Sequence, residues 1–276
     1  MPPGPNPPDS GMPPYEERLR ALEHRLAEAA RGFEQARDSR CVFTHAYALM
    51  TRLIAEGIPR TPGLDGIWTA DLAEAFAGRY FAALAAGDTG NGSRAWTAAF
   101  TAMRNRRTSV VEDLVFAMTV HIEHDLPLAL QDVSGDGAPV QDHIYDFDSI
   151  NDILASSIHA IVDSVARRYS PYIAWLDRLG RPYDVVITDF GIRTSRGLAW
   201  YNAVQLADRR AREGAQEAIE DGPKDFIDDV VNPRVRSLRV VLRFLRWIVS
   251  FLRTWPRAGT ERGMDIRAGT PPPRHP

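Results

Sequence analysis

The sequence predicts an all-α protein: a single multi-helix bundle between disordered Pro-rich tails. Apolar residues recur every three or four positions over most of the chain, which is the spacing of amphipathic helices. No stretch alternates apolar and polar residues as a half-buried strand does; the nearest exception, YDVVITDF at 183–190, fits a strand or a buried helical turn. With 276 residues, 44% of them hydrophobic, the chain can bury one substantial core.

The first helix is expected at 15–38, where Leu19, Leu22 and Leu26 share one face. It follows a segment of proline, glycine and small polar residues at 1–14, whose composition cannot pack a core. The stretch CVFTHAYALMTRLIAEG, 41–57, is apolar on nearly all sides and should lie in the middle of the bundle. Further helices are predicted over 69–86, 92–106, 109–125, 147–168, 171–179 and 192–219.

The chain is expected to divide into a helical core domain, 15–222, and an amphipathic C-terminal helix, 223–255, between tails at 1–14 and 256–276. Within VRSLRVVLRFLRWIVSFLRTW, 235–255, a basic stripe on an apolar surface is formed by Arg236, Arg239, Arg243, Arg246 and Arg253. This pattern fits peripheral membrane contact through 235–255. The favoured alternative is packing on the bundle, with the arginines facing solvent or Asp228 and Asp229.

Charge and cysteine content narrow the class of protein. The formal net charge is −3, so the chain lacks the global basic field that marks nucleic-acid binders, and no nucleic-acid partner is expected. Cys41 is the single cysteine and cannot form an internal disulfide. The N-terminal segment lacks the basic and apolar regions of a secretory signal. We therefore expect a cytoplasmic location, with peripheral contact to the inner face of the membrane as an alternative.

One apolar segment, TVHIEHDLPLAL at 119–130, carries four ionisable residues. His121 and Asp125 are four residues apart, so on a helix they point from one face and would bind one metal ion or share one proton. His124 lies on the flank of that face. Because proline restricts the residue before it, Pro127 should end the helix near Asp125. The alternative is a charge-assisted hydrogen bond that only orders the helix end.

Further donors follow in DHIYDFDSINDILASSIH, 142–159. A divalent zinc, iron or manganese ion would take imidazole and carboxylate ligands from His121, Asp125, His143, Asp146 and Asp148. Asp148 also suits the cap of a helix. Two other histidines, His45 and His159, are interpreted as core residues rather than ligands, because a lone buried histidine is more often satisfied by packing.

Arg196 and Trp200 are four residues apart in TSRGLAW and so share a helical face. In a substrate site the arginine would clamp a phosphate or carboxylate, while Trp200 and Asn151 contact the substrate. The slightly favoured alternative is a buried pair between Arg196 and Asp146 or Asp125, with Trp200 in the core.

Three segments, HIEHDL, DFDSINDIL and FGIRTSRGLAW, resemble the recurring motifs of an uncharacterised bacterial helical family, the domain of unknown function 5995. The resemblance covers most of 40–215 and implies no activity. The family's polar and aromatic signatures fall on His121, Asp125, Asp146, Asn151, Arg196 and Trp200. In addition, AMTVHIEHDLPLA is similar to the His-x-x-x-Asp helix of zinc-dependent phospholipase C and S1-type nucleases, although 127–130 replace that motif's further histidines.

These patterns favour a metal-assisted enzyme in which Arg196 neutralises developing charge. Apolar walls suggest a lipid-, isoprenoid- or polyketide-like substrate, with hydrolysis of a phosphoester or ester as the reaction. One alternative is a natural-product cyclase: DDVVN, 228–232, and NDILASS, 151–157, resemble, in reversed order, the magnesium-binding motifs of class I terpene synthases. The other is a non-catalytic helical protein that binds a partner or a membrane.

Overall fold

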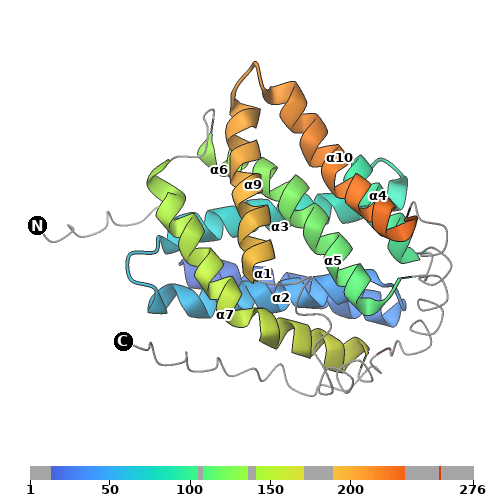
Figure 1. The fold of residues 1–276 in the computed structure, drawn as a ribbon. Coiled ribbons are helices and arrows are strands. Elements are labelled where there is room, and N and C mark those ends of the chain that lie inside the picture. Colours follow the sequence, from blue (N-terminus) through green and yellow to red (C-terminus); the bar gives the residue numbers. More distant parts are fainter. Residues whose placement is uncertain (1–13, 105–107, 136–140, 171–188, 234–254, 256–276) are drawn as a thin grey trace, which may run out of the picture.

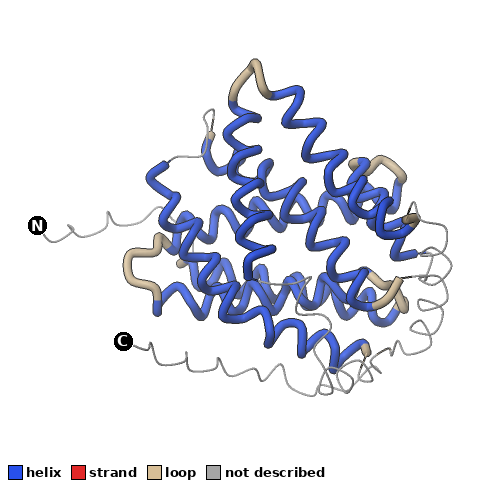
Figure 2. The backbone as a smooth tube through the Cα atoms, in the orientation of Figure 1, coloured by secondary structure: helices blue, strands red, loops and turns tan. Residues whose placement is uncertain are grey.

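A computed structural model of the chain describes residues 14–104, 108–135, 141–170, 189–233 and 255 (Figure 1). Every regular element among them is helical, which confirms the predicted all-α class (Figure 2). The helix expected at 171–179, the first six residues of YDVVITDF, the Arg-striped stretch up to 254 and the C-terminal tail lie outside the described residues, as does the N-terminal tail up to 13.

The first two helices pack against each other as an antiparallel pair. Helix α1 (Tyr15–Gln35) buries the leucines predicted for its inner face. Helix α2 (Arg40–Gly57) is buried along almost its whole length, so the prediction that it lies in the middle of the core is confirmed. The close approach of α2 to α7 depends on Gly57, because a Cβ there would lie 2.7 Å from the Ile153 side chain.

A short 3-10 turn, η1 (Ile58–Arg60), leads to α3 (Gly66–Thr89), which begins three residues before the predicted start. The reason is a cap: Asp65 Oδ1 accepts the backbone N–H groups of Ile67 and Trp68 at 2.9 and 3.1 Å. Helix α4 (Arg94–Arg104) follows and buries Trp96 against the core.

The segment predicted to end at Pro127 continues as helix. Helix α5 (Val110–Val120) begins with a capping box of Ser109 and Glu112, passes into a π-helical turn, η2 (His121–Asp125), and then into α6 (Leu126–Ser134). The prediction that the helix ends near Asp125 was therefore wrong. Proline lacks an N–H and therefore interrupts the regular hydrogen bonding of an α-helix. The π-turn before Pro127 accommodates this interruption, because the N–H of Leu126 donates five residues back, to the carbonyl of His121.

After η3 (Gln141–His143), the long helix α7 (Ile144–Tyr169) packs on α2, and α9 (Asp189–Ala207) packs on α6. The single helix expected at 192–219 is interrupted between α9 and α10 (Arg212–Val231). The turn is closed by Arg212 Nε, which donates to the Leu206 carbonyl at 2.8 Å. In Figure 1 the two helices form a hairpin whose connecting turn stands at the top of the molecule. Helix α10 also crosses the boundary expected at 222 and 223 without interruption.

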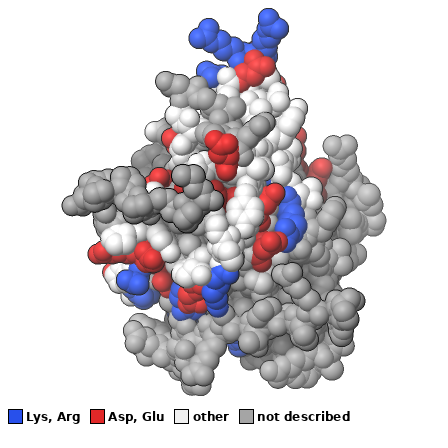
Figure 3. All heavy atoms as spheres, turned by 90° about the vertical axis from the view of Figure 1, so that its left-hand side faces the viewer, with Lys and Arg blue, Asp and Glu red and all other residues white. Residues whose placement is uncertain are grey.

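One main hydrophobic cluster joins α2 to most of the other helices, and half-buried Trp255 packs against it. Among the described residues, no helix combines the length and the apolar character that crossing a bilayer requires. On the face shown in Figure 3, acidic and basic side chains are intermixed, and basic groups protrude at the top, where the turn between α9 and α10 exposes Arg209, Arg210 and Arg212.

Candidate functional site

The π-turn directs three ionisable side chains into the bundle. His121, His124 and Asp125 are only 2%, 8% and 1% exposed. Short π-helical insertions cost helix stability and occur often at functional sites. This turn is therefore the first feature of the fold that points to a function.

Asp125 is the acceptor at the centre of the group. Its two oxygens accept from His121 Nδ1 at 2.8 Å, from His124 Nδ1 at 2.7 Å, and from the indole Nε1 of Trp96 at 3.0 and 3.1 Å. Burial alone would raise the pKa of Asp125, but the hydrogen bonds from the two histidines outweigh burial and lower it. Asp125 is thus an ionised carboxylate inside the core.

The two histidines differ in charge. Burial lowers the pKa of His121 despite its hydrogen bond to Asp125, so this ring is neutral at neutral pH, with its proton on Nδ1. Burial acts the same way on His124, but the bond to Asp125 and the nearby Glu220 prevail and raise its pKa. Both ring nitrogens of His124 contact carboxylate oxygens, of Asp125 and of Glu220, and both must therefore donate. The resulting arrangement is one carboxylate, one imidazolium and one neutral imidazole.

His124 also connects this group to the outer helices. Its Nε2 lies 3.3 Å from Glu220 Oε1 on α10, and Glu220 Oε2 accepts the backbone N–H of Arg94 at 2.8 Å. Glu220 therefore satisfies a free donor at the start of α4 while it holds the imidazolium. This chain of contacts fixes the orientation of the π-turn relative to α4 and α10.

Aromatic rings enclose His121. Its ring stacks on Phe76 with centroids 3.6 Å apart, and the Tyr47 ring meets it edge-on at 4.7 Å. The other ring nitrogen, Nε2, has no hydrogen-bond partner among the described residues, and neither has the Tyr47 hydroxyl. Both residues line a cavity of about 70 Å³ whose walls are otherwise mostly apolar. Two buried polar atoms without partners in one cavity wall require an explanation.

Arg196 of α9 lines the same cavity and is 5% exposed. Its guanidinium donates to Asn151 Oδ1 and to the Phe147 carbonyl, and lies 4.2 Å from the centre of the Phe147 ring. The favoured expectation that Arg196 pairs with Asp146 or Asp125 was therefore wrong. Trp200 is half-buried and packs on the core, 4.9 Å from the Phe147 ring, as expected in that alternative.

The remaining predicted ligands form a separate group at the start of α7. Asp146 accepts from His143 Nδ1 and from the backbone N–H of Asp65, both at 2.8 Å, and the His143 ring stacks on Trp68. Asp148 is exposed and contacts the Asn151 side chain at 3.4 Å. Within the described ranges, no three His, Cys, Asp or Glu side chains are grouped so as to hold a metal ion.

The two isolated histidines have different positions. His45 is buried and contacts Ser164 Oγ at 3.3 Å, in agreement with its interpretation as a core residue. His159 is exposed on α7, so placing it in the core was wrong. Sequence reasoning missed Tyr47, Trp96 and Glu220 as members of the site. No local signal marks them, because each reaches the π-turn from a distant part of the chain.

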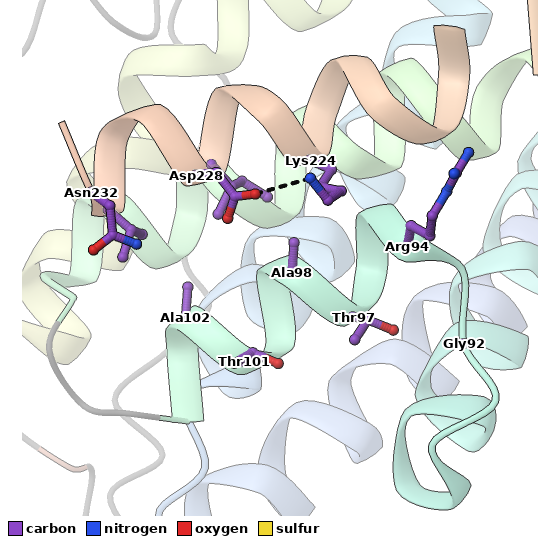
Figure 4. A pocket seen from close by; sticks show the side chains of 11 residues that line it. Gly92, Arg94, Thr97, Ala98, Thr101, Ala102, Lys224, Asp228 and Asn232 are labelled. Carbon is purple, nitrogen blue, oxygen red and sulfur yellow. Dashed lines mark hydrogen bonds and ion pairs between the residues drawn. The ribbon is translucent and has the colours of Figure 1, made fainter. Parts of the chain in front are cut away.

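A wider groove lies between α4 and α10, with a volume of about 450 Å³ (Figure 4). Lys224 and Asp228 face each other across one turn of α10 at 3.0 Å on its rim. This groove contains Asp228 and Asn232 of the predicted DDVVN motif. The NDILASS motif lies on α7 instead, and its Leu154 lines the smaller cavity beside His121. The two motifs thus line different hollows.

The whole described bundle corresponds to a known sequence family. The model of a family of unknown function (DUF5995) matches residues 18–233, and the chain belongs to this family. A search of curated proteins and a search of solved structures each found no match. The match extends beyond the 40–215 covered by the motif resemblance and includes α1 and α10 as well as the π-turn.

Proposed function

We propose that this protein is an enzyme in which His121 acts as a general base on a small apolar substrate, with hydrolysis of an ester as the simplest reaction. The observation that supports the proposal is the state of the imidazole. Nδ1 is held by an ionised carboxylate, while Nε2 meets no described partner at the wall of an apolar cavity. A neutral imidazole oriented in this way offers a lone pair for proton transfer.

In the proposed reaction, a water molecule attacks the ester carbonyl carbon while its proton passes to His121 Nε2. Asp125 stabilises the imidazolium through the bond to Nδ1. The proton then moves to the alcohol oxygen as the C–O bond of the tetrahedral intermediate breaks, which yields a carboxylic acid and an alcohol. The Tyr47 hydroxyl, which also lines the cavity, is the proposed donor to the carbonyl oxygen.

Trp96 and His124 support this base without contacting the cavity. Their hydrogen bonds hold Asp125 in place, so the carboxylate cannot rotate away from His121. Asp125, Trp96 and His124 are therefore positioning residues, and His121 and Tyr47 are the residues proposed to contact substrate. This division of roles resembles other histidine–carboxylate pairs, in which the carboxylate fixes the tautomer of the base.

A metal-assisted form of the reaction would use the same nitrogen. The Asp125 oxygens accept hydrogen bonds from three side chains, so a divalent ion would bind His121 Nε2, with Asp125 orienting the ring from behind. Metal analysis of the purified protein and of His121→Ala tests this form: stoichiometric metal that is lost in the variant supports it, and metal-free active protein contradicts it.

The proposed function is tested with p-nitrophenyl propionate, because a cavity of about 70 Å³ suits only a very short acyl chain. Removing a general base typically lowers the rate about 10²- to 10⁴-fold, so His121→Asn should lose nearly all turnover. His159→Asn, which changes an exposed histidine, is the matched control and should keep the rate. Thermal unfolding followed by circular dichroism establishes that both variants are folded.

A folded His121→Asn variant with the rate of the unaltered protein would contradict the role of His121. Absence of turnover in the unaltered protein, together with binding of apolar ligands, would favour the non-catalytic binding protein instead. The phosphoester and cyclase alternatives stay predictions, with p-nitrophenyl phosphate diesters and isoprenoid diphosphates as their respective probes.

A further inference from the structure

Arg196 carries a buried charge that makes no direct contact with a carboxylate in the described part of the bundle. The guanidinium is 5% exposed, and its contacts are the Asn151 amide oxygen, the Phe147 carbonyl and the Phe147 ring, none of which is charged. The carboxylate that acts on it electrostatically, exposed Asp148, is joined to it only through the side chain of Asn151. On the same helix, Arg193 forms an ion pair with Asp152 at 2.7 Å, so that carboxylate is occupied elsewhere. A buried cation is costly unless something compensates its charge.

Among the described residues, the other buried arginine and a half-buried one are compensated directly by carboxylates. Arg18, 8% exposed, contacts Asp71 and Glu74 at 2.6 Å each, and Arg168 donates two hydrogen bonds to Glu34. Arg196 lacks the direct carboxylate contact that Arg18 and Arg168 have. Burial lowers the pKa of Arg196 to about 10, but the side chain stays protonated at neutral pH.

We infer that the cavity binds a small monocarboxylate, with the Arg196 guanidinium holding the carboxylate and the alkyl chain lying among apolar side chains. Those walls come from several helices and include Met50, Leu72, Ile150 and Leu154. The chemistry of the site matches both parts of such a ligand. A guanidinium is the preferred partner of a planar carboxylate, and the apolar walls gain from covering a short hydrocarbon chain.

This inference rests on the cavity used in the proposed function and specifies what enters it. A short-chain carboxylate is also the product that ester hydrolysis releases, so one pocket would recognise the acyl half of the substrate. His121 and Arg196 would then have separate tasks: the histidine transfers the proton, and the arginine selects an anionic or polarised acyl group. If one of the two proposed roles is wrong, the other can still be measured.

The test is calorimetric titration of the full chain with propionate and with 1-propanol, which share a chain length short enough for a cavity of about 70 Å³ and differ in charge. The unaltered protein should bind propionate more tightly than propanol. Because hydrogen bonds to charged groups contribute strongly, Arg196→Gln should weaken propionate about 10- to 100-fold and leave propanol unchanged. Arg193→Gln, on the same helix but at the surface, is the matched control and should change neither ligand.

Equal binding of propionate and propanol by the unaltered protein would overturn the inference, and this comparison needs no variant. Equal loss of both ligands in a folded Arg196→Gln variant would also overturn it, since Arg196 would then only shape the cavity. The proposed function is judged separately. If His121→Asn keeps both ester hydrolysis and propionate binding, the role of His121 as general base is wrong and the carboxylate site stands.

Discussion

The stability of the bundle should depend strongly on the charge of Asp125. The substitution Asp125→Asn keeps the size of the side chain and removes its negative charge. In the unaltered protein this carboxylate, 1% exposed, accepts from Trp96, His121 and His124 at 2.7–3.1 Å. An asparagine has one acceptor oxygen and an NH₂ group that opposes a donor, so at least one of these bonds is lost.

The larger effect comes from the imidazolium of His124, which loses its nearest counter-charge and, among the described residues, keeps Glu220 at 3.3 Å. Breaking a buried ion pair on one side typically costs about 3–5 kcal/mol, and we expect a loss of that size in the free energy of unfolding. Domains are commonly stable by about 5–15 kcal/mol, so the variant should remain folded but with a clearly lower urea midpoint.

The assay is urea unfolding followed by circular dichroism, with Asp132→Asn as the control. Asp132 also accepts two bonds from one arginine, Arg79, at 2.6 and 2.9 Å, but both side chains are about 40% exposed. An exposed pair of this kind contributes about 1 kcal/mol or less. A loss in Asp125→Asn no larger than that of the control would refute the description of Asp125 as the centre of the buried group.

The same comparison has a pH dependence whose sign follows from the two pKa shifts. The lowered pKa of Asp125 gives stability that is present above its ordinary value of 3.8 and lost as the pH falls further. The raised pKa of His124 gives stability that is complete below 6.5 and lost as the pH rises through the raised value. The difference between the unaltered protein and Asp125→Asn should therefore be largest between these two values.

Two further predictions concern the core away from the site. Burial lowers the pKa of His45 to about 4, so unfolding should become easier as the pH falls from 6.5 towards 4. By about pH 4 the loss in the free energy of unfolding that is due to His45 is about 3 kcal/mol. In urea titrations, His45→Gln should remove this part of the acid sensitivity. An unchanged dependence of stability on pH in the variant would contradict the prediction. Gly57→Ala should destabilise the protein by about 1–3 kcal/mol, because the added methyl group overlaps Ile153. The control, Gly78→Ala at an exposed helical position, should stabilise it by up to about 1 kcal/mol. Equal shifts of the thermal unfolding midpoint in the two variants would contradict the close packing of α2 on α7.

The helical class could be predicted because apolar spacing is a local property. Leu19, Leu22 and Leu26 lie within one stretch of chain, and their period alone indicates which face is buried. The continuation of the helix past Pro127 could not be predicted in the same way. Propensity favours a helix end before proline, whereas packing of α6 against α3 and α9 favours continuation, and the π-turn reconciles the two.

The residues of the candidate site show the same division. His121 and Asp125 were predicted to share a face, and they form the expected hydrogen bond. Arg196 was assigned a carboxylate partner that it does not contact, because nothing in the local sequence states which helices meet at α9. Asp146 and His143 were grouped with the π-turn because of their chemical type alone. In the structure His143 contacts Asp146, and Asp146 accepts the backbone N–H of Asp65 at the start of α3.

Periodicity, composition and four-residue spacing, all properties of neighbouring positions, were enough to determine the all-helical class, the inward face of α1 and the His121–Asp125 pair. Tertiary structure alone decided that Trp96 and Glu220 complete the group, that Tyr47 and Arg196 share a cavity with His121, and that the remaining acids lie elsewhere. The physical reason is that a buried charge is compensated by whichever donor the packing brings within hydrogen-bond distance, and packing joins residues far apart in the chain.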